Sequence, residues 1–492
     1  MLERGRTRSA ITRVHERLKY RGEKKEEEEE EKMPERYGFG GLQESETMAR
    51  SDALDLFSPE PVEGRTLDRK PCQAKPTSGV SGPGPFQIVL PSEKFTYIDP
   101  GSIRIIGTFK IRRVNAAREV SDLTDPVDVM PVNLFTKSLF KDIEVELENQ
   151  KISLNSSNTY GVKAYVSTAL SYGKDAATGH LACSGWLKDT AGKFDNFDQN
   201  TNGLERATYI AKSKLFSFAD NLHTELTTTN RLITPGITVK LKFIIEDPSA
   251  FLISKVAGTE HKIEFHDFYV TYDRILLKES EHGGKEKELM ITPAIYPYTS
   301  TEIRTKGISP GLGSIEWYSA FTGNLPEQVV ICMNSQDAAD GAAEKNIFNF
   351  QRFGMKTCSL IVNSRRLPVV PLEFQDPATH YETITYRHYV DNCGVDISNA
   401  PTQITLKEYM GDNGYCIIPF DLTTDRCALF HGHEKKEGSI ALDIKLDTPL
   451  TTAVNVYMIF IYKDYFYITG SADTRKVHLM YPTKKKNGDG WN

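Results

Sequence analysis

The sequence predicts an all-β protein made of two consecutive domains of the same topology. Apolar residues alternate with polar residues at a period of two along several short segments, and similar segments recur in the same order in each half of the chain. At 492 residues the chain is too long for one ordinary hydrophobic core, so two or more packed units are expected. Many short strands of this kind are typical of sandwiches, barrels and jelly rolls.

The alternating segments each carry one apolar and one polar face, which is the pattern of an antiparallel sheet. Their apolar members are Ile143, Val145 and Leu147; Ile237, Val239, Leu241 and Phe243; Ile440, Leu442, Ile444 and Leu446; and Val454 with Val456. Helical spacing occurs within Ser156–Ser171, which predicts one short helix with an apolar face of Val162, Tyr165, Val166, Ala169 and Leu170.

The evidence for duplication is a repeated strand–turn–strand unit. DIEVELENQKISL has its turn at Asn149-Gln150, and KTCSLIVNSRRLPV has its turn 214 positions later, at Asn363-Ser364. Each half also ends with an alternating strand followed by an aromatic-rich strand. We therefore predict β-domains at 86–280 and 288–482, separated near Glu281–Lys287, a polar segment expected to be flexible.

The two ends of the chain differ in composition from its middle. Residues 1–58 begin with scattered arginines followed by the run Glu26–Glu31, which predicts a disordered extension; a true start at Met33 or Met48 is the alternative. Residues 59–85, rich in Pro and Gly, predict an extended lead-in. Residues 483–492 form a basic tail that is either simply solvated, a nuclear address, or in contact with DNA.

Cysteine usage and hydropathy indicate a soluble protein that folds in a reducing compartment. The seven cysteines form no CxxC pair, which argues against a disulfide framework and a structural zinc site. The N-terminus lacks the apolar stretch of a signal peptide, and no apolar run is long enough to span a membrane. A net charge of −6 does not indicate a surface built to hold nucleic acid.

Five segments follow one another in an order and hydrophobic pattern shared with a known family. They are SDALDLFSPEP (51–61), FQIVLPSEKFTYIDPGSIRIIGTFKI (86–111), PVNLFTKSLFKDIEVELENQKIS (131–153), LHTELTTTNRLITPGITVKLKF (222–243) and NIFNFQRFGMKTCSLIVNSRRLPVVPLEF (346–374). Over about residues 51–482 the chain resembles the hexon-like double jelly-roll major capsid proteins of Polinton (Maverick) elements and adintoviruses.

The resemblance implies two consecutive eight-stranded antiparallel jelly rolls with long loop insertions. It also implies a structural capsid protein without catalytic activity, whose trimers form pseudo-hexameric capsomers of an icosahedral shell around double-stranded DNA. The implied partners are further copies of the chain, vertex or minor capsid proteins and, nonspecifically, packaged DNA, with no membrane. The implied location is the virion, after synthesis in the host cytoplasm and assembly there or in the nucleus.

Two long insertions follow from this interpretation, at 171–207 and 374–409. Long loops of a jelly roll gather at the ends of the sheets and can carry contacts between subunits. The aromatic residues Trp186 and Phe194 of the first insertion are either anchors of an interface or residues that pin the loop to its own domain.

One motif suggests a metal site. His431-Gly-His433 followed by Glu437 has the ligand spacing of a cupin, another double-stranded β-fold, and a single-chain bicupin or lectin-like jelly-roll module is therefore the alternative function. The flanking glycines do not fit that motif, and the setting is a charged turn. His478, the obvious further histidine, has no motif around it. We predict an exposed hairpin turn without a metal.

Other chemical motifs are weaker. Asp198, Asn200, Asn202 and Gly203 begin like a calcium loop, but Tyr209 stands where a glutamate is required, which predicts a polar loop. The sequon Asn155-Ser-Ser157 is expected to be unused without a secretion signal. No nucleophile elbow, P-loop or zinc-protease motif occurs, so we predict no catalytic, cofactor-binding or metal-binding residues and no cofactor.

Overall fold

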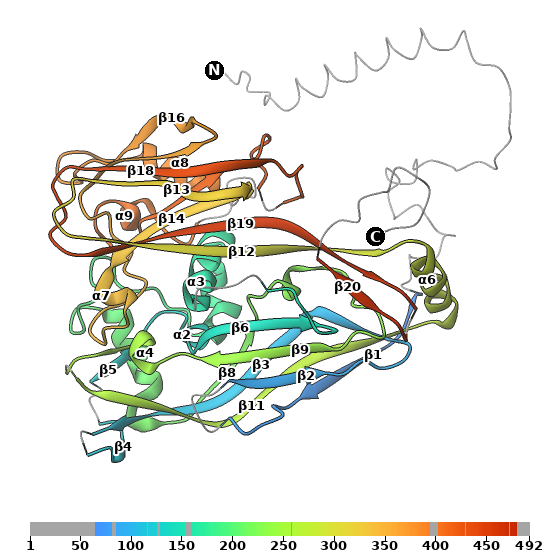
Figure 1. Cartoon of the computed structure of the whole chain (residues 1–492). Coiled ribbons are helices and arrows are strands. Elements are labelled where there is room, and N and C mark those ends of the chain that lie inside the picture. Colours follow the sequence, from blue (N-terminus) through green and yellow to red (C-terminus); the bar gives the residue numbers. More distant parts are fainter. Residues whose placement is uncertain are drawn as a thin grey trace, which may run out of the picture. The chain divides into compact units, whose positions relative to one another are not determined.

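The computed structural model describes residues 64–479, apart from 81–84, 116, 125–127, 154–158, 257, 394–401, 429 and 472. The predicted N-terminal extension, the sequon and the basic tail lie outside these described residues. Antiparallel strands dominate the described part, and Figure 1 shows them gathered into two sandwiches.

The first sandwich consists of two sheets that face each other across an apolar core. One sheet has the order β1-β11-β3, with β4 and β8 both paired to β3, and contains β1 (Thr66–Ala74), β11 (Glu260–Leu277), β3 (Thr96–Val114), β4 (Val120–Asp122) and β8 (Phe216–Asn221). The other has the order β2-β9-β6-β7 and contains β2 (Phe86–Leu90), β9 (Val239–Ile245), β6 (Phe140–Leu147) and β7 (Gln150–Lys151). A separate pair joins β5 (Val129–Pro131) to β10 (Leu252–Ser254).

The second sandwich repeats this plan. One sheet has the order β12-β19-β14-β17, with β20 paired to β19, and contains β12 (Ala294–Ile308), β19 (Val454–Thr469), β14 (Gln328–Ser335), β17 (Ile417–Asp421) and β20 (Lys476–His478). The other has the order β13-β18-β15-β16 and contains β13 (Ser314–Asn324), β18 (Glu437–Leu446), β15 (Met355–Val362) and β16 (Arg365–Glu373).

Both sandwiches have the same strand connectivity. Let the eight main strands of each sandwich be lettered B to I in chain order, so that the first uses β1, β2, β3, β6, β7, β8, β9 and β11 and the second uses β12 to β19. One sheet of each sandwich then has the order B-I-D-G and the other has the order C-H-E-F. This is the connectivity of a jelly roll, and its occurrence twice confirms the predicted double jelly roll.

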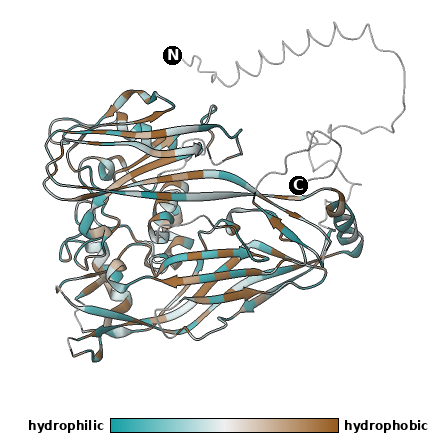
Figure 2. Ribbon diagram, in the orientation of Figure 1, coloured by the Kyte–Doolittle hydropathy of each residue, from teal (hydrophilic) through white to brown (hydrophobic). Residues whose placement is uncertain are grey.

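The alternating segments predicted as strands correspond to β6, β9, β18 and β19, although Ile237 precedes β9, and their apolar residues are buried. Figure 2 shows this as alternating brown and teal along the strands. The repeated hairpins turn through consecutive residues of positive φ, Glu148-Asn149 and Asn363-Ser364. Such turns match the twist of the strands they connect. In the first hairpin the turn therefore lies one residue earlier than predicted, since Gln150 already belongs to β7.

The predicted helix is α3 (Tyr160–Ser171), and all five residues of its predicted apolar face are buried. It packs against β6, and Figure 1 places it between the two sandwiches. The other α-helices are α2 (Phe135–Ser138), α4 (Thr201–Ile210), α5 (Pro248–Phe251), α6 (Glu279–Ile291), α7 (Gln336–Ala339), α8 (Ile384–Asn392) and α9 (Leu406–Tyr409), with short 3-10 turns at 174–178, 180–184, 211–213 and 226–228.

The segment between the two sandwiches differs from its prediction. Residues 281–287, expected to be flexible, lie within α6. Glu279 and Glu281 stand in its first turn, where carboxylates stabilise the positive end of a helix, and His282 and Leu289 are buried. Local charge placement and two buried side chains therefore make this polar segment helical.

Candidate assembly surfaces and side-chain clusters

The first long insertion meets the second half of the chain at a buried seam. Arg206 and Asp189, both from the first insertion, form an ion pair whose side chains are 0% exposed. The Nε of Arg206 also donates to the carbonyl oxygen of Pro131 at 2.9 Å. From the second half, the hydroxyl of Tyr415 donates to the Asp189 carbonyl oxygen at 2.6 Å, and the Asn346 amide lies 3.4 Å from the Asp189 carboxylate. Asp189 thus connects the first insertion with the second half of the chain.

Trp186 and Phe194 are buried at the same seam. Trp186 packs on Tyr165 of α3, whose ring stacks on Phe348 from the second half with centroids 4.2 Å apart. Phe194 meets Tyr415 edge-on at 4.9 Å. Of the two interpretations made from the sequence, pinning of the loop therefore fits these residues, and the pinning extends to the other half of the chain.

Exposed apolar side chains gather on the edge strand β16 and around the start of α8, and these two elements contact each other. The set comprises Val369 (86% exposed), Val370 (71%), Tyr381 (73%) and Ile384 (78%), which we call the β16–α8 surface. In the first jelly roll the corresponding strand, β7, has only two residues. The two domains therefore present different surfaces at equivalent places.

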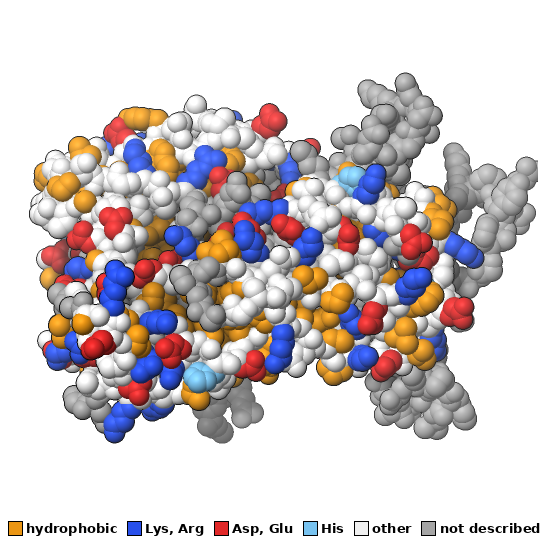
Figure 3. Space-filling model, turned by 60° about the horizontal axis from the view of Figure 1, so that its bottom comes forward, with side chains coloured by type: hydrophobic (Ala, Val, Ile, Leu, Met, Phe, Trp, Pro, Cys, Tyr) orange, Lys and Arg blue, Asp and Glu red, His pale blue; other side chains and the backbone are white. Residues whose placement is uncertain are grey.

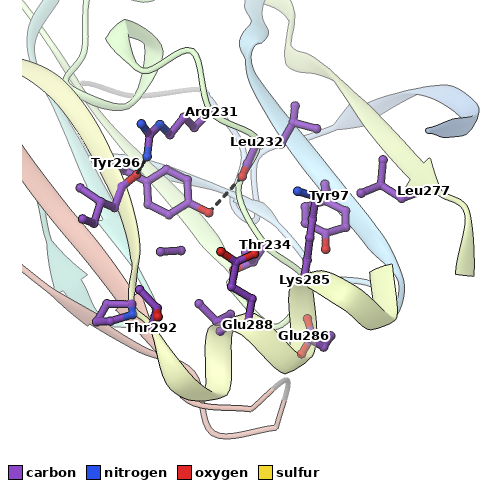
Figure 4. Close-up of a pocket in the computed structure, with 14 residues that line it drawn as sticks. Tyr97, Arg231, Leu232, Thr234, Leu277, Lys285, Glu286, Glu288, Thr292 and Tyr296 are labelled. Carbon is purple, nitrogen blue, oxygen red and sulfur yellow. Dashed lines mark hydrogen bonds between the residues drawn. The ribbon is translucent and has the colours of Figure 1, made fainter. Parts of the chain in front are cut away.

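A pocket of about 450 Å³ opens where α6 meets both domains. Figure 4 shows Lys285, Glu286 and Glu288 of α6 on one side, with Tyr97 of β3 and Tyr296 of β12 across from them. The Tyr296 hydroxyl donates to the carbonyl oxygen of Leu232 at 3.0 Å. Burial, supported by the charge of Glu286, raises the pKa of Tyr97 to about 12, so this pocket is lined by neutral phenols.

The cupin-like spacing, which the sequence does not predict to be a metal site, is only partly realised in the structure. His431 and His433 lie in the loop between β17 and β18, and the ligand atoms of Asp425, His431 and His433 lie within 4.8 Å of one another. Glu437, the carboxylate that the motif would use, begins β18 and pairs with Asn324. His478 stacks on Tyr467 instead. Sequence spacing therefore found the histidines but missed Asp425, which a loop fold brings close.

The calcium-like segment has a structural role. The side-chain oxygen of Asn200 accepts from the Gly203 backbone at 3.1 Å and caps α4, while its amide donates to Asp189 at 2.7 Å. Asn202 donates to the carbonyl oxygen of Lys188. These contacts use the polar side chains to start a helix and to support the seam.

Charge on the surface is mixed. On the face drawn in Figure 3, basic and acidic side chains are interspersed. None of the seven cysteines forms a disulfide, and four of them, Cys332, Cys358, Cys393 and Cys416, are buried. None of the helices in the described segments has the length and apolar character needed to cross a membrane.

A half-buried histidine makes the fold acid-sensitive. Desolvation lowers the pKa of His388 on α8 to about 4, below the ordinary value of 6.5, and its ring packs on Phe420. Between these values the unfolded chain binds a proton that the folded chain does not, so stability falls as pH drops from 6.5 to 4. We expect the His388→Gln variant to lose up to about 3 kcal/mol less stability than the wild type over this pH range. The measurement is the chemical-denaturation midpoint of each protein as a function of pH.

The exposed histidine His266 supplies the control for that experiment. His266→Gln makes the same substitution at an exposed position and should leave the pH dependence unchanged. An unaltered acid profile in His388→Gln would contradict the prediction.

Comparisons with known proteins bear on the fold. No protein-family model matches the sequence. The uncharacterized protein F54H12.2 of Caenorhabditis elegans is 23% identical over 377 residues, which cover 74% of this chain and 87% of that protein. A chain in the structure of the Sputnik virophage superposes with a TM-score of 0.59 at 10% identity, covering 94% of this chain and 98% of that one.

The mavirus major capsid protein superposes with a TM-score of 0.50 at 12% identity, covering 92% of this chain and 97% of that one. These likenesses extend over both jelly rolls, and at the level of the fold they confirm the resemblance noted in the sequence. The chain has the double jelly-roll fold of hexon-like viral major capsid proteins.

Proposed function

We propose that this chain is a structural, non-catalytic major capsid protein that assembles as a homotrimer. The observation that carries the proposal is the same eight-stranded connectivity occurring twice in one chain. Three such chains present six similar domains, which is what a position of six-fold symmetry in a shell requires. Similarity to virophage proteins over nearly the whole chain supports the same role.

In such a trimer the first domain of one copy would contact the second domain of the next. A closed ring of this kind uses heterologous contacts, in which unlike surfaces meet. The difference between the short β7 and the long, apolar-bearing β16 supplies such unlike surfaces. We assign the β16–α8 surface to this interface, which as part of an obligate assembly should bury more than ~2,000 Å².

The proposal extends from the trimer to the whole virus particle. We propose that the trimers tile an icosahedral virion shell around double-stranded DNA, together with vertex or minor capsid proteins, after synthesis in the host cytoplasm and assembly there or in the nucleus. Any contact with DNA is assigned to charged segments outside the described residues. We place the first domain from β1 to β11 and the second from β12 to β20, which moves the start of the first domain into the predicted lead-in.

The bicupin alternative has less support. A cupin holds its metal with histidines inside the β-sandwich, whereas His431 is exposed and lies with His433 on the β17–β18 loop. The structural role therefore has the stronger support.

The test is the mass of the full chain in solution by light scattering and native mass spectrometry. We expect a trimer of three 55.4 kDa chains, about 166 kDa, and larger assemblies in kosmotropic salt. The double variant Val369→Asp/Val370→Asp should dissociate the trimer at least 10-fold more readily, since it places two carboxylates in an apolar contact.

The matched control is Leu312→Asp, an apolar-to-acidic change at a half-exposed residue of the β12–β13 turn. It should leave the trimer intact. A wild-type chain that stays monomeric at high micromolar concentration and does not assemble in salt would refute the proposed function. If the wild type is a trimer and the Val369→Asp/Val370→Asp variant is an equally stable trimer, only the assignment of the surface is refuted.

A further inference from the structure

A cluster of nitrogen and oxygen donors lies on the second jelly roll, in the loop between β17 and β18. The Nε2 of His431 is 2.9 Å from one carboxylate oxygen of Asp425, and the Nε2 of His433 is 2.8 Å from the other. The two imidazole centroids are 4.5 Å apart. Two imidazole nitrogens therefore converge on a single carboxylate.

A second carboxylate lies beside one of these rings. Glu327, directly before β14, has its Oε1 3.2 Å from the Nδ1 of His433 and accepts the His433 backbone N–H at 3.0 Å. Metal-bound histidines are typically held in this way, with one ring nitrogen on the metal and the other on a carboxylate. Here the Nε2 of His433 is left to face Asp425 and His431.

The charges suit a divalent cation. With both histidines neutral, Asp425 and Glu327 leave two negative charges around the convergent nitrogens. The donor atoms of Asp425, His431 and His433 lie within 4.8 Å of one another. Lys435, two residues after His433, forms an ion pair with Asp464.

We propose that Asp425, His431 and His433 form a binding site for a divalent transition metal of the zinc class, with Glu327 as the outer carboxylate that orients His433. Two imidazoles with one carboxylate suit zinc, cobalt or nickel rather than calcium or magnesium, which prefer oxygen donors. Ligands around such a metal are ~3.3 Å apart, given bonds of about 2.0–2.1 Å, so the contacts seen here need widen only slightly. Water or a group from another molecule would complete the coordination.

The metal would connect two separate parts of the sandwich. Asp425, His431 and His433 belong to the β17–β18 loop, whereas Glu327 belongs to the β13–β14 connection. Binding would therefore fix a charged surface loop against the body of the second jelly roll. This inference does not depend on the proposed capsid function, because the four residues lie in one chain.

The experiment is equilibrium dialysis of the full chain against Zn²⁺ with metal analysis, and Co²⁺ absorption as a second readout. We expect one tightly bound ion per chain and cobalt d–d bands without a thiolate charge-transfer band. The latter separates this site from the free cysteines. Bound zinc should also raise the melting temperature in a saturable way, and the affinity should fall with acid, because protons compete for the imidazoles.

The variants identify the ligands. His431→Ala and His433→Ala should each weaken binding by more than about 100-fold, and Glu327→Gln, which acts through His433, by about 10–100-fold. His266→Ala, an exposed histidine elsewhere, should bind zinc as the wild type does. If the wild-type chain binds no zinc at concentrations up to about 100 μM, the range of dissociation constants of weak metal sites, the proposal is overturned. The cluster would then be an ion-pair network. Undiminished binding in His431→Ala/His433→Ala would also overturn the proposal.

Discussion

Arg206→Met is expected to lower the free energy of unfolding by about 3–5 kcal/mol, because it leaves the Asp189 carboxylate buried without a counter-charge. Both side chains of the pair are fully buried, so water cannot replace the lost guanidinium. The variant also removes the hydrogen bonds that Arg206 donates to the carbonyl oxygens of Pro131 and Leu187. The measurement is the chemical-denaturation midpoint at one fixed protein concentration, since oligomers unfold in a concentration-dependent way.

A double variant separates the charge effect from lost packing. Arg206→Met/Asp189→Asn should recover much of the loss, because the uncompensated charge is then gone. The control is Lys75→Met, which removes one partner of the exposed Lys75–Asp267 pair and should cost less than about 1 kcal/mol. Equal losses in Arg206→Met and Lys75→Met would show that the seam does not stabilise the fold.

The strands could be predicted because burial on one face of a sheet imposes a period of two on the sequence. β18 is the clearest example, with Ile440, Leu442 and Ile444 buried in alternation. β1 escaped prediction because it lies at a sheet edge and exposes most of its side chains, so TLDRKPCQA carries no such period. α6 escaped because its sequence, ESEHGGKEKELMI, buries only His282 and Leu289, too few to produce a helical period.

The residues of the histidine cluster show which contacts residue spacing in the sequence can predict and which it cannot. His431 and His433 are two residues apart, and spacing alone could find them. Asp425 and Glu327 approach them only because the β17–β18 loop folds back toward the start of β14. Likewise Asp189 and Tyr415 are 226 positions apart and meet only when the first insertion packs against the second half of the chain. Such pairings depend on tertiary packing, and period or spacing in one sequence does not reveal them.

Arg352→Met is expected to cost a similar 3–5 kcal/mol and, unlike the Arg206 variant, to loosen α8 selectively. Arg352 and Glu382 are each 5% exposed and pair at 2.7 Å just before α8 begins. The guanidinium also donates to the Tyr409 carbonyl oxygen at 2.9 Å and stacks over Phe374 at 4.9 Å. One side chain thus holds both ends of the second insertion.

Arg352→Lys discriminates between charge and shape at this position. Lysine keeps the charge but cannot reach Glu382 and Tyr409 together with a planar fork, so it should recover only part of the stability. Amide hydrogen exchange should become faster in α8 for both variants, while Lys356→Met, which breaks an exposed pair with Asp447, should leave it unchanged. Because α8 carries Ile384 of the β16–α8 surface, Arg352→Met should also weaken the trimer. Unchanged exchange in α8 would mean that other contacts hold the insertion.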